Sequence, residues 1–71
     1  MLTKTAFQEK YGIAVGPNDR WTVVPDLKSR GVAGRLIREI EKTFDDVLGA
    51  QVTPKPDSAL YNLTIEWVPQ A

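Results

Sequence analysis

The residues able to carry acid–base or nucleophilic chemistry are few, and they do not form a catalytic pattern. The sequence has no histidine and no cysteine, so imidazole catalysis, thiolate chemistry and the usual zinc ligands are excluded. Adjacent carboxylates on a helix point about 100° apart, which separates Asp45 from Asp46; Glu39 and Glu41 diverge likewise, and Glu66 stands alone on a strand. The hydroxyls of Ser29, Thr43 and Ser58 lack an imidazole partner that could activate them as nucleophiles. We expect no catalytic residues, no metal site and no cofactor, and therefore no enzyme.

The charge pattern has one anomaly, a basic segment followed by an acidic one. Four of the nine positive charges lie within residues 28–38, which contain no acid: Lys28, Arg30, Arg35 and Arg38. Residues 39–46 then carry Glu39, Glu41, Asp45 and Asp46 against Lys42 alone. On one helix this order opposes the macrodipole, which favours acids at the start by roughly 0.3–1 kcal/mol per charge. The pattern indicates a polarised contact surface, unless Arg35–Glu39 and Lys42–Asp46 pairs of about 0.3–0.5 kcal/mol each offset the loss.

The segment Gly31-Val32-Ala33-Gly34 lies inside the basic stretch and precedes a run with helical spacing. A glycine turn that opens a helix lets the backbone approach phosphates, and the helix N-terminus and nearby cations add attraction. With Ile37 and Ile40 three and six places after the second glycine, the run resembles the Gly-x-x-Gly loop and helix of KH domains. Ala50-Gln51-Val52 after Gly49 is similar to the strand that follows in type I KH domains.

This resemblance implies binding of single-stranded nucleic acid, because the KH loop clamps four backbone nucleotides. The residues that would bind are Lys28, Arg30, Gly31, Gly34, Arg35 and Arg38. The likeness spans residues 21–68 in element order but only about ten residues by motif, and apolar Val32 and Ala33 stand where the family has polar or basic residues. The alternative is that the two glycines only permit a tight turn and close packing against a sheet.

The elements that position these residues follow from hydrophobic spacing and from glycine and proline. Apolar residues at spacings of three and four predict a long helix over residues 34–48 with Gly49 as its C-cap. A short helix is predicted over residues 3–11, with Thr3 or Thr5 as N-cap and Gly12 just after its end.

Three strands are predicted from β-branched and aromatic residues and from alternation. They are residues 20–24, ended by Pro25, residues 50–53, ended by Pro54, and residues 60–68. The predicted fold is α+β, a two-layer sandwich of order α-β-α-β-β with one main amphipathic helix on a small three-stranded sheet. The alternation places Trp21, Tyr61 and Trp67 on the core face and predicts a polar open face.

Length and net charge set the remaining limits. The length of 71 residues predicts one domain over residues 1–71. The formal net charge of zero argues against a strongly basic nucleic-acid binder. No apolar run approaches the roughly 20 residues that span a bilayer, and residues 1–10 lack a secretory apolar region. We therefore expect no membrane partner and a cytoplasmic location.

Two functions remain open. The first is a small non-catalytic module, such as an adaptor, inhibitor or accessory protein, which binds another protein through the charge-polarised helix or the polar sheet face. The second is KH-like binding of single-stranded nucleic acid through residues 28–38. A homo-oligomer is compatible with either function. A domain near 70 residues buries only about 60% of its unfolded surface, so its stability margin is small and self-association would add to it.

Overall fold

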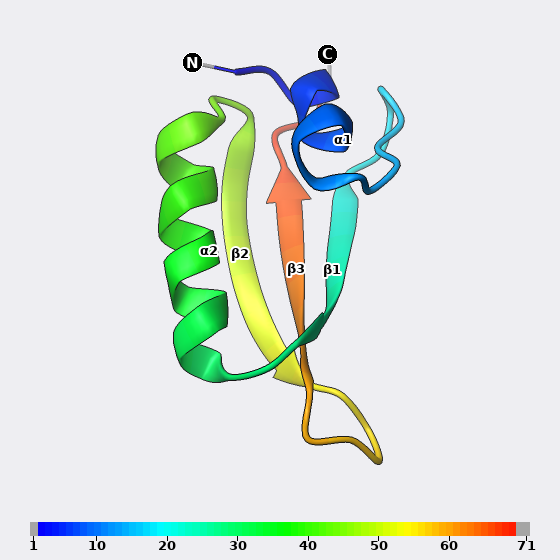
Figure 1. Ribbon diagram of the computed structural model, residues 1–71. Coiled ribbons are helices and arrows are strands. Elements are labelled where there is room, and N and C mark those ends of the chain that lie inside the picture. Colours follow the sequence, from blue (N-terminus) through cyan, green and yellow to red (C-terminus); the bar gives the residue numbers. More distant parts are fainter. Residues whose placement is uncertain (1, 70–71) are drawn as a thin grey trace.

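The computed structural model describes residues 2–69, which form two helices and one three-stranded sheet (Figure 1). In chain order the elements are α1 (Thr5–Tyr11), β1 (Trp21–Leu27), α2 (Arg30–Thr43), β2 (Val47–Pro54) and β3 (Tyr61–Trp67). The α+β class and the order α-β-α-β-β predicted from the sequence are confirmed.

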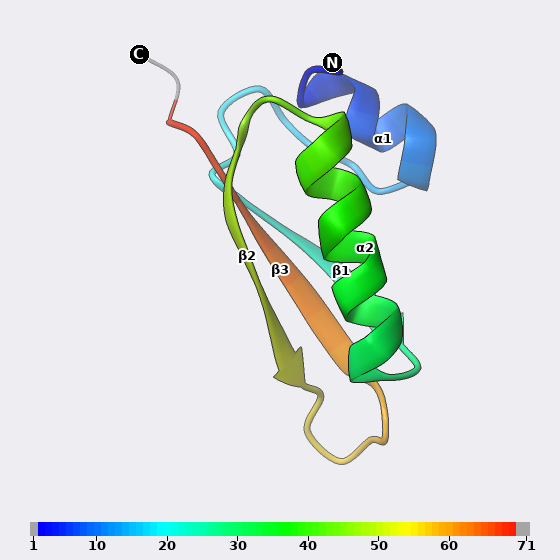
Figure 2. The ribbon, with the colours of Figure 1, turned by 90° about the vertical axis from the view of Figure 1, so that its left-hand side faces the viewer.

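The sheet has the strand order β1-β3-β2, and β3 pairs antiparallel with both neighbours. The two outer strands therefore run parallel to each other, and α2 connects them across the central strand. Figures 1 and 2 show α2 lying over one face of the sheet. Among residues 2–69 no helix covers the opposite face, which we call the open face.

The core lies between β3 and the two helices. Leu63, Ile65 and Trp67 are fully buried, which confirms the alternation predicted for this strand. The rings of Phe7 and Phe44 pack against Trp67 with centroid distances of 5.4 and 6.1 Å. Residues far apart in the sequence thus share one aromatic cluster, and α1 belongs to the core through Phe7.

Helix α1 is attached to the body by buried polar contacts as well as by Phe7. Lys4, not Thr3 or Thr5, is the N-cap residue, and no side chain caps this helix. The Lys4 side chain is buried, and its Nζ donates to the backbone oxygens of Pro17 and Asp19. Gly12 ends the helix with φ 70°, as predicted.

Helix α2 begins at Arg30 and ends at Thr43, so the predicted bounds of 34 and 48 are wrong. At its start the Ser29 hydroxyl accepts the Val32 N–H at 3.1 Å and caps the helix. At its end Phe44 takes an extended conformation, forms a bridge with Leu2 and is buried in the aromatic cluster.

The early end of α2 leaves the following residues to β2. Val47 begins that strand, and Gly49 lies within it instead of capping the helix. The strand is therefore longer than the predicted 50–53, whereas β3 is slightly shorter than the predicted 60–68. The apolar spacing did not distinguish a helix from a strand here, because a short apolar run such as Val47-Leu48 is compatible with either.

Strand β1 continues through Pro25 to Leu27 and does not end at Pro25 as predicted. The pairing with β3 shifts at Pro25 and Asp26, which form a β-bulge, and Asp26 has φ 63°. An edge strand tolerates proline because the missing N–H can fall on the side without a neighbouring strand.

Trp21 lies on the open face, so its predicted place in the core is wrong. The register puts it opposite Glu66, and 53% of the residue is exposed. Of the other two aromatic residues predicted for the core face, Trp67 is buried and Tyr61 is half-buried. Alternation correctly groups Trp21 with the exposed Val23 but cannot say which face of the sheet a helix will cover.

Candidate functional site

The structure divides the positive charges into two groups. Of the nine Lys and Arg residues, Lys10, Arg20 and Lys55 form ion pairs with Glu39, Glu66 and Asp26. Lys4 is buried and binds backbone oxygens. The remaining five have no ion pair within residues 2–69 and all lie on α2 or just before it: Lys28, Arg30, Arg35, Arg38 and Lys42. We call these five residues the basic surface.

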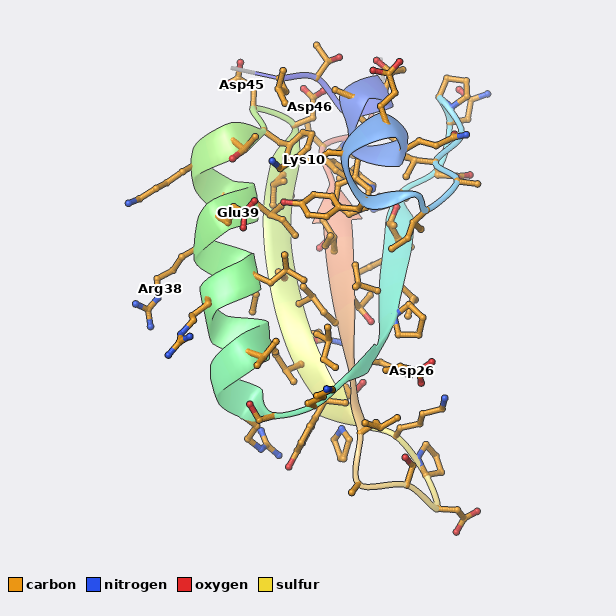
Figure 3. The ribbon with its side chains drawn as sticks, viewed as in Figure 1. Lys10, Asp26, Arg38, Glu39, Asp45 and Asp46 are labelled. Carbon is orange, nitrogen blue, oxygen red and sulfur yellow. The ribbon has the colours of Figure 1, made fainter. Side chains whose placement is uncertain are left out.

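The helical repeat places three members of the basic surface on one outer face. Arg35, Arg38 and Lys42 follow one another at spacings of three and four residues and are all exposed, so they lie on one face, roughly 4.5 and 6 Å apart along the helix axis. Figure 3 shows Arg38 pointing away from the sheet. The opposite side of the helix carries the buried Ala33 and Ile40.

The other two members lie at the N-terminal end of α2. The Arg30 guanidinium lies 5.1 Å from the centroid of the Tyr61 ring, a cation–π contact that orients the side chain while its charge stays exposed. Lys28 is exposed in the short connection between β1 and α2. The first turn of α2 contains no acidic residue, so no acid in that turn offsets the positive charges of Lys28 and Arg30.

The helix is less polarised than the sequence predicts, because the predicted acidic end is not helical. Asp45 and Asp46 lie beyond α2, in the turn before β2 (Figure 3), where Asp46 Oδ2 accepts the Lys4 N–H at 3.1 Å. The compensating pairs Arg35–Glu39 and Lys42–Asp46 do not form within the described residues.

Glu39 instead turns toward α1. Its Oε1 lies 3.5 Å from Lys10 Nζ and accepts the Tyr11 hydroxyl at 3.0 Å, and Figure 3 shows Lys10 and Glu39 facing each other. Burial of Tyr11, then the hydrogen bond and the negative charge of Glu39, raise the tyrosine pKa to about 12. With Glu39 engaged by α1, Glu41 is the one acid of α2 without an ion pair within residues 2–69.

Gly31 and Gly34 do not form a loop. Both lie inside α2, which starts at Arg30, so the predicted glycine turn and the loop implied by the KH resemblance are wrong. Of the six residues predicted to bind, Arg30, Arg35 and Arg38 are cations of α2, and Lys28 lies in the connection just before it. The two glycines are helical positions without side chains.

Sequence reasoning missed one member of the surface. Lys42 lies within the acidic stretch of the sequence, yet it belongs with Arg35 and Arg38 by its helical spacing. That spacing was available in the sequence and could have identified it. The exposure of Trp21 had no such signal, because it depends on which sheet face receives α2.

Two other kinds of site are absent from the described part of the chain. Residues 2–69 contain no cluster of three or more carboxylates placed to hold a metal ion. No helix in this part of the chain is long and apolar enough to cross a membrane.

Comparisons with protein-family models, with curated proteins and with solved structures found no match for this chain.

Proposed function

We propose that this chain is a small non-catalytic module that docks its basic surface on an acidic surface of a partner protein. The observation that carries the proposal is the segregation of charge. Every cation outside α2 and its N-terminal connection is paired or buried, whereas the five cations of the basic surface lack ion pairs within residues 2–69.

Such a surface favours binding to an opposite charge. Clustered like charges repel one another, and attraction to an acidic partner offsets that repulsion. Complementary charge also steers encounters and raises association rates by roughly 10- to 1000-fold. Because the chain is neutral as a whole, this attraction is confined to one side of the molecule.

A protein partner is favoured over single-stranded nucleic acid by the position of the aromatic residues. Proteins that bind single strands place stacking aromatic rings beside cations on one surface. Here the exposed Trp21 lies on the open face, whereas the cations lie on the helix that covers the other face. The Tyr61 ring is already in contact with Arg30.

The test is capture of partners from a nuclease-treated lysate of the source cells by the immobilised chain. We expect protein partners to be retained by the native chain and lost with Arg35→Glu/Arg38→Glu, with an association rate at least about tenfold lower. Arg38→Glu alone should also weaken capture, and Lys55→Glu is its matched control, since it makes the same charge change away from α2. Capture that is insensitive to the α2 reversals would contradict the proposal.

Nucleic-acid binding through residues 28–38 is the second candidate, because those residues carry four cations and no acid. Single-stranded RNA and DNA should then bind with a log–log salt slope near −3, from about −0.7 per phosphate contact. Binding of that strength and slope, abolished by Arg30→Glu/Arg35→Glu, would favour this candidate over a protein partner.

A further inference from the structure

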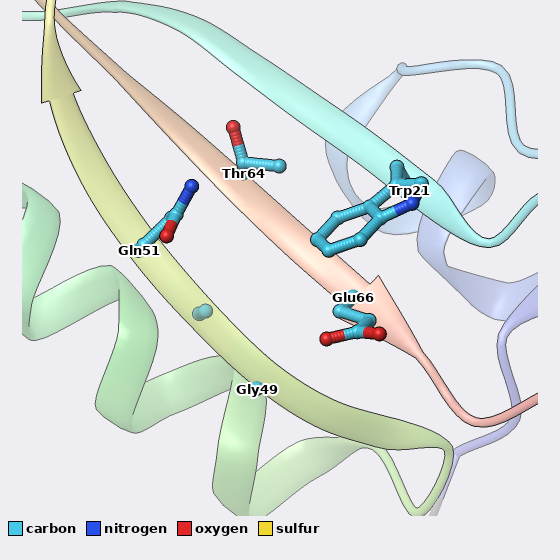
Figure 4. A pocket seen from close by; sticks show the side chains of 6 residues that line it. Trp21, Gly49, Gln51, Thr64 and Glu66 are labelled. Atoms are coloured by element: carbon cyan, nitrogen blue, oxygen red, sulfur yellow. The ribbon is translucent and has the colours of Figure 1, made fainter.

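The open face contains a hollow that the basic surface does not use. Its volume is about 100 Å³, and its lining residues come from all three strands: Trp21, Gly49, Ala50, Gln51, Thr64 and Glu66. In Figure 4 the indole of Trp21 reaches from β1 over β3, between Thr64 and Glu66. The hollow is much smaller than the roughly 300–1,000 Å³ clefts that hold small-molecule ligands, so it suits a single side chain.

The hollow exists because Gly49 has no side chain. The register places Trp21, Glu66 and Gly49 side by side across the three strands. A Cβ added at Gly49 would have no heavy atom within 4 Å. A glycine within a strand often marks a place where another group approaches closely.

The lining is suited to a cation. Glu66 is its one charged residue, and Arg20 donates from Nε and Nη2 to the same oxygen, Oε2, at 3.1 and 2.9 Å. Within residues 2–69 the other carboxylate oxygen, Oε1, accepts no hydrogen bond. An exposed indole beside a carboxylate binds an ammonium or guanidinium group by cation–π and charge attraction together.

We propose that this hollow receives a lysine or arginine side chain presented by a partner protein. The aliphatic stem packs against the Trp21 indole, and the charged head reaches Glu66 Oε1. The site lies on the opposite face of the sheet from the basic surface (Figure 2). It is independent of the proposed function, and each can fail without the other.

The test titrates the full chain with short peptides, acetyl-Gly-Gly-X-Gly-Gly-amide, in which X is lysine, arginine, norleucine or glutamate. Binding is followed by the fluorescence of Trp21, since Trp67 is buried and contributes a constant background. We expect saturable changes with lysine and arginine on the order of 1–10 mM, and at least tenfold weaker binding of norleucine, which keeps the stem but lacks the charge.

Four variants distinguish binding at this site from an effect on folding. Gly49→Val puts a side chain into the hollow, its Cβ meets no heavy atom within 4 Å, and valine is a better strand residue, so it should fold normally and lose binding at least tenfold. Glu66→Gln should also weaken binding. Arg20→Gln should strengthen it severalfold, because Arg20 competes for the same carboxylate. Arg35→Glu/Arg38→Glu should leave peptide binding unchanged.

Several results would overturn the proposal. They are equal binding of the norleucine peptide, full binding by Gly49→Val, weaker binding by Arg20→Gln, or no change with any peptide. If Trp21 fluorescence changes with protein concentration alone and the chain sediments as a dimer that Gly49→Val dissociates, a second copy occupies the hollow and a partner protein does not.

Discussion

Individual side chains determine which charges stay available for binding. Lys4 and Arg38 carry the same charge, yet Lys4 is buried against backbone oxygens and Arg38 extends from α2 into solvent. A buried cation is retained only where oxygens replace its lost water. Lys4 therefore serves the fold by holding the loop before β1, and Arg38 is free to serve a contact.

Tyr11 should couple stability to alkaline pH. Its pKa is raised from 10.0 to about 12, first by burial and then by Glu39, so the folded chain holds this proton more tightly than the unfolded chain. Its contribution to stability is fully present below pH 10 and is lost as the pH rises through about 12. Tyrosinate absorbance, followed through a pH titration, measures this transition.

Two variants control the tyrosine titration. Glu39→Gln should lower the Tyr11 pKa without returning it to 10.0, because burial is the larger cause. Tyr11→Phe should remove the upper transition altogether. Ionisation of Tyr11 near pH 10 in the native chain would contradict the prediction.

Thr22 should contribute to stability through one buried hydrogen bond. Its hydroxyl accepts the Trp67 indole N–H at 2.7 Å in the core. Thr22→Val keeps the shape of the side chain but leaves that N–H without its partner, so we expect a loss of about 1–3 kcal/mol in the free energy of unfolding. Urea denaturation measures it, with Thr53→Val on the exposed part of β2 as control. An unchanged midpoint for Thr22→Val would contradict the assignment.

At the scale of elements, the sequence predicted type and order well and boundaries poorly. The alternation of β3 was informative because this strand is central and one of its faces packs against helices. The end of α2 was not predictable in the same way, since the helical spacing continues past Thr43. What ends the helix is the packing of Phe44 against Phe7 and Trp67, which are distant in the sequence.

The glycines of α2 provide a test of that element. Gly34 lies inside the helix, and an added Cβ there meets nothing within 4 Å. Gly34→Ala should therefore raise the free energy of unfolding by up to about 1 kcal/mol. Gly12→Ala is the matched control and should lower it by about 1–2 kcal/mol, because Gly12 has φ 70°. Destabilisation by Gly34→Ala in thermal unfolding would indicate a loop at this position, as in the KH resemblance.

The candidate site was predictable only in part, because it too depends on contacts between residues that are distant in the sequence. The basic character of residues 28–38 is local and could be identified from the sequence. The pairing of Lys10 with Glu39 and of Lys55 with Asp26 depends on tertiary contacts, and it is this pairing that leaves the cations of α2 as a distinct group. The sequence alone also could not show that the exposed indole and the cations lie on opposite sides of the molecule.

At the scale of the whole molecule, the structure is a single sheet with one covered face and one open face. The aromatic residues Phe7 and Trp21 illustrate the difference, since Phe7 is fully buried and Trp21 is 53% exposed. Phe7→Ala should cost about 3–5 kcal/mol, a large part of the roughly 5–15 kcal/mol that stabilises a typical domain. Trp21→Ala should cost far less, because its ring leaves no cavity in the core.

Urea unfolding of the two variants, followed by the fluorescence of the buried Trp67 and by circular dichroism, tests this contrast. We expect Phe7→Ala to shift Trp67 emission to longer wavelength and to loosen α1, because the Phe7 ring lies 5.4 Å from Trp67. Trp21→Ala should unfold close to the native midpoint, with the exposed component of the emission missing. A Trp21→Ala variant as unstable as Phe7→Ala would mean that the indole supports the fold. An exposed indole that costs little to remove is instead available for contact, as its position beside the Gly49 hollow requires.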